Sequence, residues 1–500
     1  MNTRISIPSE SCWRKWHIVS VFFLICIFML RPAMTQHWDA AYSFYGRIFV
    51  LSVIGLYLFM RRFDNPVEVN LVLAYAVWAI ICRFCRLDFF LYYDTNVIIG
   101  RFLCVAVIGA GPLMDARQRK TFLRWLCAVF CAYHVVVAVL AIAANVLGTQ
   151  IFIPPEAVFG HSSYDANTLN YIIPFGVYRN TTAMWFYIAL FLAIYSVITR
   201  PHLLVRVLYG LAALVLYVAV VLTFCRSVMV ATICTLAMLA VLFALKYIPW
   251  PKLWQKAAVV LLCLALVLPL SYKSFGWTSS AMSWLSSRIL TEESASPASA
   301  PQGEAAPAGE AVSSEGSAAE VPVPAEEQSG VSLVDNRDIL KDAATLTNRT
   351  KIYATLIPTM KEDPLRIFFG ASFSDMMDIP HRLSGWRYYH MHDAWLQALM
   401  EFGVPGFLIM MAFCILLIVR MVIMFFSVDP RCGLAEKFLI LPLTGFFIYS
   451  LIEICIFNPS GMFTDAVNVE IRELMFFLLS GFFLADSYSV LPSLRRNKLH

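Results

Sequence analysis

Long apolar runs separated by short polar segments dominate the chain. Spanning a bilayer takes about 20 mostly apolar residues, so runs of that length predict membrane helices. The predicted helices cover 16–33, 42–60, 67–84, 95–114, 121–147, 183–199, 205–224, 228–246, 254–273, 400–424, 438–457 and 473–490. The pattern therefore predicts an all-α polytopic membrane protein with about twelve transmembrane helices.

The basic residues between these runs predict the orientation, because cytoplasmic loops of membrane proteins carry an excess of Lys and Arg. With a cytoplasmic N-terminus, the inside segments would hold Arg14, Lys15, Arg61, Arg62, Arg117, Arg119, Lys120, Arg200, Arg206, Lys246, Lys252, Arg431, Lys437, Arg495, Arg496 and Lys498. Every second segment is basic along the whole chain. Both termini are therefore predicted to be cytoplasmic.

The loops divide the chain into three parts. We expect a transmembrane region at 1–274 with about nine helices, a large extracytoplasmic loop at 275–399, and a transmembrane region at 400–500 with about three helices. Within the loop, about 291–330 holds eight glutamates and no Lys or Arg among Ala, Pro, Ser and Gly, a composition typical of disorder. The part at about 333–392 mixes apolar, aromatic and basic residues, so we expect it to be ordered against the membrane.

Composition supports the membrane class and narrows the partners. The chain is 60% hydrophobic and 14% charged, against about a quarter charged in a soluble domain. The net charge of +5 sits in short clusters between apolar runs, which argues against a nucleic-acid partner. Most of the thirteen cysteines lie inside apolar runs, and Cys82 and Cys85 form a CxxC without a second pair, a weak metal signal.

A polar and aromatic cluster at 386–406 is the clearest candidate for chemistry, because polar groups at membrane depth are expensive. His390 and His392 lie where the large loop re-enters the membrane. The simpler interpretation is a polar helix cap beside interfacial aromatic residues. A His-x-His pair can also bind a metal, but Asp393 and Asp375 do not complete a site with convincing spacing, so we predict no metal and no cofactor.

Four arginines are candidates for binding an anionic substrate. Arg226 lies at the predicted outer end of one helix and close to the start of the next, and Arg349 lies in the ordered part of the large loop. Snorkelling or a salt bridge is the alternative for each. Arg101 lies deep in an apolar run and requires a partner or a polar cavity. Arg179, in the loop at about 148–182, is the weakest of the four.

These residues occur in motifs that resemble the O-antigen ligase/polymerase family of bacterial surface-glycan enzymes. His392-Asp393 followed by a spacer and Gly403-Val-Pro-Gly406 resembles the family's His, small polar residue and Gly-x-x-Gly. The segment before this histidine resembles the one that the family carries there, through Arg349, Ile352, Tyr353, Pro364 and Phe369 to Phe373. Earlier in the chain, Cys225-Arg226-Ser227 resembles the family's Ser-Arg signature at an outer helix end. Three positions depart from the family: Asp393 stands where Asn is usual, Tyr353 where Trp is common and Ala371 where Gly is common.

The resemblance implies transfer of a glycan from a polyprenyl-diphosphate donor to an acceptor hydroxyl, at the outer face of the bacterial plasma (inner) membrane. Arg226 and Arg349 would bind the diphosphate as rigid forks. His392 would be the general base, and His390 would orient it or bind sugar. Asp393 could raise the basicity of the imidazole or hold it in an ion pair. The acceptor could be a glycan, a lipid or a protein, so ligase and polymerase stay open.

Two other classes compete with this interpretation. A transporter or flippase for lipid-linked glycans would place charges near the membrane midplane and show internal repeats, but only Arg101 lies there and no convincing repeat is evident. A receptor or scaffold would use the large loop, much of which is low in complexity and poorly suited to a defined interface.

Overall fold

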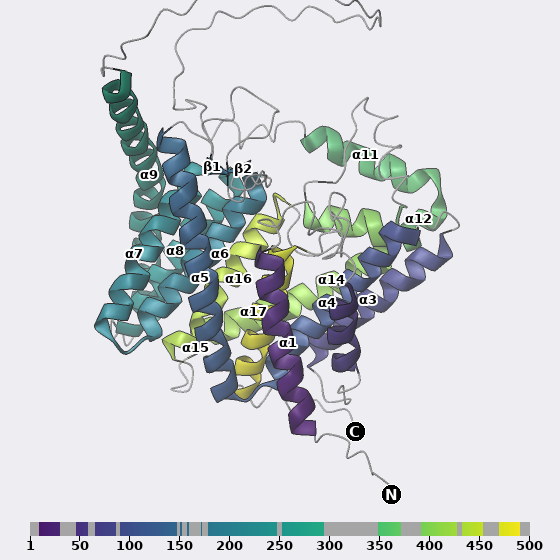
Figure 1. Ribbon diagram of the computed structural model, residues 1–500. Coiled ribbons are helices and arrows are strands. Elements are labelled where there is room, and N and C mark those ends of the chain that lie inside the picture. The colour runs from purple at the N-terminus through teal and green to yellow at the C-terminus, as the bar shows by residue number, and fades with distance from the viewer. Residues whose placement is uncertain are drawn as a thin grey trace, which may run out of the picture.

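The computed structural model describes residues 10–30, 47–58, 66–86, 91–147, 151–152, 158–159, 172, 179–247, 253–294, 349–371, 391, 393–427, 433–453 and 470–490. These residues are almost entirely helical (Figure 1). The first half holds α1 (Glu10–Leu30), a helix at Arg47–Leu58, α3 (Val67–Cys85), α4 (Leu91–Leu113), α5 (Ala116–Leu147), α6 (Arg179–Thr199), α7 (Leu203–Leu222) and α8 (Arg226–Tyr247). The second half holds α9 (Leu253–Ser294), α11 (Arg349–Glu362), α12 (Pro364–Phe369), α14 (Ala394–Phe426), α15 (Leu434–Phe438), α16 (Ile440–Ser450) and α17 (Ile471–Val490).

Each of the twelve apolar runs coincides with a described helix, so the all-helical prediction is confirmed. Nine described helices are long and apolar enough to cross a membrane, and the protein is a multi-pass membrane protein. The described parts of two other runs form shorter apolar helices, Arg47–Leu58 and Val97–Leu113, and α16 has 11 residues. The count of twelve, the side on which the termini lie and the three-part division of the chain stay predictions.

The structure adds one strand pairing and one extension to the predicted pattern. The strands β1 (Ile151–Phe152) and β2 (Val158–Phe159) pair antiparallel, with Ile151 opposite Phe159. α9 continues to Ser294, although its apolar run ends near residue 273. Hydropathy indicates which residues can lie in the hydrocarbon core of the membrane. It does not indicate where the helix ends, because a helix can continue into the polar region outside the core. The described residues 275–294, at the start of the predicted large loop, are therefore helical, and 291–294 belong to the segment predicted to be disordered. The rest of that segment lies outside the described residues.

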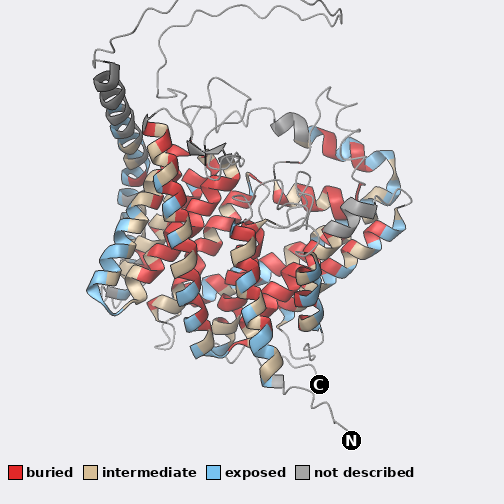
Figure 2. Ribbon diagram, in the orientation of Figure 1, coloured by how far each residue is buried: buried red, intermediate tan, exposed pale blue. Residues whose placement is uncertain are grey.

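The centre of the bundle is formed by α6 and α17, which are the most deeply buried spans, whereas α7 and α9 face outward (Figure 2). α17 packs along α4 at close range. A Cβ atom on Gly111 would come within 2.2 Å of the backbone of Gly481, and one on Gly481 would come equally close to the carbonyl of Ile108. Glycines let membrane helices approach closely enough for backbone contact, and this contact fixes the register of the two helices.

Basic residues from the predicted inside segments gather at one end of the bundle. Lys120 and Lys246, from two of these segments, line a hollow of about 340 Å³ together with Arg124 and Glu436. Arg226 and Lys246 lie at opposite ends of α8, so roughly 30 Å separate them along its axis. Figure 1 shows α11 and α12 at the end of the bundle opposite to the start of α1. This arrangement supports the predicted orientation.

Candidate functional site

The turn between α7 and α8 places Arg226 at the first position of α8. Thr223 ends α7, where its hydroxyl donates to the carbonyl of Val220 at 2.6 Å and accepts from the backbone N–H of Cys225 at 3.4 Å. Phe224 has a φ of 49°, a left-handed conformation that is rare outside glycine and costs free energy. The tight turn sets the guanidinium-bearing residue at a helix N-terminus, where the helix dipole favours anions.

A network of polar side chains lies beside this turn and joins four helices. Asn180 accepts a hydrogen bond from the Cys225 thiol at 3.1 Å and donates its amide N–H to Glu453 Oε1 at 2.8 Å. The Tyr449 hydroxyl donates to the Asn180 carbonyl at 3.2 Å, and Arg472 donates to the Tyr449 hydroxyl at 3.1 Å. The starts of α6, α8 and α17 and the end of α16 therefore meet at one polar centre.

The start of α14 is fixed by the side chains of Asp393 and Gln397, which bind backbone N–H groups after and before position 392. Asp393 caps the helix, and its Oδ1 accepts from the backbone N–H groups of Trp395 at 2.8 Å and Leu396 at 2.9 Å. The buried side chain of Gln397 accepts from the backbone N–H of Met391 at 2.9 Å. The backbone is thereby held on both sides of His392. His390 and His392 themselves lie outside the described residues.

α11 packs onto this helix start through a small apolar cluster. The cluster contains Tyr353, Leu356, Met360, Ala371, Met391, Leu396, Leu399 and Met400. Arg349 is the first residue of α11, one helical turn before Tyr353. Its side chain lies outside what the structure describes, but Tyr353, the next turn of the same helix, packs against the cluster that contains Met391.

α14 is kinked at Gly403, and the kink meets the end of α12 at a second glycine. Gly403 has a φ of 66° and Gly370 a φ of 74°, both in the left-handed region that favours glycine. A Cβ on Gly403 would lie 2.3 Å from the Phe368 carbonyl oxygen, and a Cβ on Gly370 would lie 2.3 Å from the backbone of Glu401. The two glycine motifs found in the sequence are therefore in direct contact.

Arginines from the end of α3 hold this junction together. Pro405 has no N–H to donate to the Glu401 carbonyl, and Arg86 donates to that oxygen instead and also to the carbonyls of Phe369 and Ala371. Arg83 forms a buried ion pair with the side chain of Glu401. Trp78, also on α3, donates its indole N–H to the Phe402 carbonyl at 2.9 Å. The backbone carbonyls at the kink are thus hydrogen-bonded to side chains of α3 and of the residue that follows it.

The predicted site residues separate into two groups. Arg226 and the first residue of α6, Arg179, lie beside the Asn180 network, and the helix ends carrying Arg349 and Asp393 meet each other. The two groups are adjacent, because Trp395 of α14 stacks on Phe447 of α16, two residues before Tyr449 in the network, with ring centroids 6.5 Å apart.

Arg101 belongs to neither group. Its guanidinium forms a buried ion pair with Glu473, between α4 and α17, and lies over the rings of Tyr75 and Phe402 with centroids about 6 Å away. The partner that the sequence required is therefore Glu473, and the pair joins α4 and α17 inside the bundle.

Several residues that form these structures were missed in the sequence. Glu401 and Glu453 lie within apolar runs, and the same criterion that singled out Arg101 would have singled out both. Arg472 directly precedes the last apolar run, and Arg83 and Arg86 each directly follow one of the CxxC cysteines. Cys82 and Cys85 are free thiols, and no group of three His, Cys, Asp or Glu side chains within the described ranges is arranged to hold a metal ion.

Fold and site together define a multi-pass helical membrane protein whose motif-bearing residues converge at one end of the bundle. Residues 211–411 match the family model described as O-antigen ligase. The matched segment runs from α7 to α14 and includes Arg226, Arg349, His392 and Gly403 to Gly406, so the resemblance seen in the sequence is confirmed over this segment. No curated protein and no solved structure matches the chain.

Proposed function

We propose that the protein transfers a glycan from a polyprenyl-diphosphate donor to an acceptor hydroxyl, at the outer face of the bacterial plasma membrane. The observation that carries this proposal is the convergence of Arg226, the start of α11 and the start of α14 within the segment matched to the O-antigen ligase family. The family match supports glycan transfer in general. The donor, the membrane side and the residue roles are our proposal.

His392 acts as the general base. It removes the proton from the acceptor hydroxyl, whose oxygen attacks the anomeric carbon of the donor sugar. The bond from that carbon to the diphosphate oxygen breaks, and the polyprenyl diphosphate leaves with the electron pair. The proton passes from His392 to solvent or to the leaving diphosphate, so the base is regenerated. The capped backbone at 391 and 393 keeps the imidazole in place during this step.

Arg226 and Arg349 bind the diphosphate and stabilise the charge that develops on it. An arginine fork can make two parallel hydrogen bonds to phosphate oxygens, and preorganised positive charge in a partly dry site contributes strongly to catalysis. Arg226 also stands at the N-terminus of α8, so backbone N–H groups point toward the same region. His390 orients His392 or binds the acceptor sugar, and Arg179 supplies further positive charge beside Asn180.

Asp393 serves as a helix cap and holds His392 in position. Its Oδ1 already accepts two backbone hydrogen bonds, which favours a positioning role over an ion pair with the imidazole. Asparagine caps helices about as well as aspartate, so the capping role also accommodates the Asn that is usual in the family.

The test is consumption of a polyprenyl-diphosphate glycan by the purified protein, given an acceptor extract from the host and no added metal. Wild type is compared with His392→Ala and with the control His202→Ala, which alters the exposed turn before α7 at the other end of the bundle. We expect transfer by wild type and by the control, and none by His392→Ala. The size of the product separates a ligase from a polymerase.

Two outcomes would overturn the proposal. Equal transfer by wild type and His392→Ala would show that His392 is not the general base. Absence of transfer together with movement of the donor across liposome membranes would establish the flippase instead.

A further inference from the structure

A lateral crevice between α1 and α5 lies away from the proposed catalytic site. It has a volume of about 500 Å³, within the roughly 300–1,000 Å³ that small-molecule sites occupy. Its walls are almost wholly apolar and come from Ile18, Val19 and Phe22 on α1 and from Phe122 and Trp125 on α5. Val19 and Trp125 are 44% and 63% exposed, so the crevice opens sideways on the surface of the bundle.

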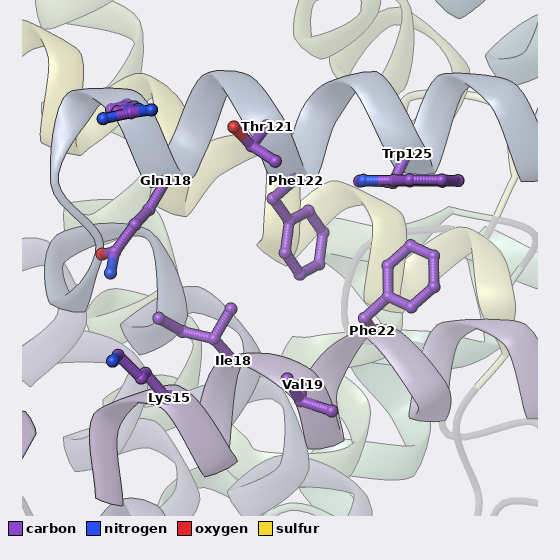
Figure 3. A pocket seen from close by; sticks show the side chains of 9 residues that line it. Lys15, Ile18, Val19, Phe22, Gln118, Thr121, Phe122 and Trp125 are labelled. Carbon is purple, nitrogen blue, oxygen red and sulfur yellow. The ribbon is translucent and has the colours of Figure 1, made fainter. Parts of the chain in front are cut away.

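The charged side chains of this crevice lie at one end. Figure 3 shows Lys15 and Gln118 at that end, and Phe22 and Trp125 at the other. Arg117, next to Gln118 in the first turn of α5, also lines the crevice. Seven residues separate Lys15 from Phe22, so the aromatic end lies about 10 Å along the helix axis from the cation.

The acidic side chain closest to Arg117 in sequence is bound to the backbone of its own helix. Asp115 precedes α5, and its Oδ1 accepts the backbone N–H of Gln118 at 2.7 Å, while the Gln118 side-chain oxygen accepts the N–H of Asp115 at 3.0 Å. This reciprocal cap commits the carboxylate to the helix backbone. Lys15 and Arg117 are both exposed, so the polar end of the crevice carries net positive charge.

The geometry points to a binding site for one anionic phospholipid of the surrounding membrane. Its phosphate would be bound by Lys15 and Arg117, and one acyl chain would lie along the apolar walls toward Phe22 and Trp125. In a multi-pass membrane protein the crevice opens to lipid, and its charge selects an anionic headgroup over a zwitterionic one. The inference is independent of the proposed transferase activity, since it uses no residue of that site.

The cations set the expected selectivity. Each Lys or Arg near an anionic lipid headgroup contributes about a fivefold gain in affinity, so the pair contributes about thirtyfold. The apolar walls contribute equally to any phospholipid with the same acyl chains. Anionic phosphatidylglycerol should therefore bind about thirtyfold more tightly than phosphatidylcholine of matched chain length.

Native mass spectrometry of the delipidated full-length protein, titrated with either lipid, tests the proposal. The double variant Lys15→Gln/Arg117→Gln should bind both lipids alike. The control Arg206→Gln/Lys246→Gln removes the same charge from helix ends outside the crevice and should keep the preference. The variant Thr121→Trp places a large ring on an exposed crevice residue and should weaken binding of both lipids.

The single variants Lys15→Gln and Arg117→Gln should each lose about fivefold, which keeps the test valid if the double variant does not fold. If the control variant lost the preference for phosphatidylglycerol to the same extent, the preference would arise from general surface charge, and the proposal would be overturned. A wild type without preference for phosphatidylglycerol, or a crevice variant that keeps it, would also overturn the proposal. Glycan transfer is not measured, so failure here leaves the proposed function unaffected.

Discussion

Breaking the buried ion pair between Arg83 and Glu401 on one side should destabilise the fold strongly, and the losses from the two sides should be non-additive. The two side chains are 1% and 0% exposed, and the Arg83 guanidinium lies over the Phe402 ring, 5.4 Å from its centroid. Removing one partner leaves the other charge buried without its counter-ion, which costs about 3–5 kcal/mol. Glu401→Gln and Arg83→Met should therefore each lower the free energy of unfolding by about that amount.

The double variant Arg83→Met/Glu401→Gln should be more stable than either single variant. Both charges are then absent, so no uncompensated charge stays buried, but the glutamine introduced at position 401 keeps a buried polar amide, and we expect a loss of about 1–2 kcal/mol. The coupling free energy between the two positions would then be several kcal/mol. Unfolding in mixed detergent micelles, followed by near-ultraviolet circular dichroism during titration with a denaturing detergent, measures all four proteins.

The exposed pair of Lys120 and Glu436 provides the matched control. Their charged atoms are 3.7 Å apart and the Lys120 side chain is 64% exposed, so Lys120→Gln should cost under about 1 kcal/mol. Additive losses at 83 and 401, or single losses no larger than the control, would refute the reasoning. They would mean that the charges reach water and that other contacts hold the kink in α14.

Four further changes test other parts of the structure. Gly403→Ala should reduce the amount of folded protein on size exclusion, because its Cβ would meet the Phe368 carbonyl and its φ is left-handed, at a cost of about 1–2 kcal/mol for the conformation alone. Asp393→Asn should keep transfer activity, whereas Asp393→Ala should lose the cap and about 1 kcal/mol of stability, measured by unfolding midpoint. Arg349→Ala should abolish donor use while leaving membrane insertion intact. Arg349→Lys should restore little donor use, because the ammonium group of lysine cannot make the two parallel hydrogen bonds of a guanidinium. Full activity of Arg349→Ala would show that Arg349 does not bind the diphosphate. Deletion of 294–329 should leave transfer nearly unchanged in the same assay, and lost activity would show that the segment has a function.

The helices and the motifs could be predicted from the sequence because both are local. Hydropathy alone located every described long helix, since about 20 apolar residues in a row leave the backbone few alternatives in a bilayer. The arginine and glycine motifs were recognisable for the same reason. Their spacing in the chain is what carries the resemblance, and the match over residues 211–411 confirms it.

Pairing across the bundle could not be predicted in this way. Arg83 and Glu401 are separated by 318 positions and Arg101 and Glu473 by 372, and only the packing of α3, α4, α14 and α17 decides that each arginine meets that carboxylate. The contact between Gly370 and Gly403 has the same origin. A charge in an apolar run shows that a partner is required, but its identity depends on which helices become neighbours.

The length of α9 and the role of Asp393 show the same division. The sequence determined the apolar part of α9. Hydropathy does not indicate where this helix ends, because its last residues lie beyond the apolar run. The sequence also placed Asp393 beside His392, and its capping role was only one of the interpretations. The structure shows that Asp393 caps α14 through the backbone N–H groups of Trp395 and Leu396, because the chain turns into the helix at this residue, whereas its effect on the imidazole stays a proposal.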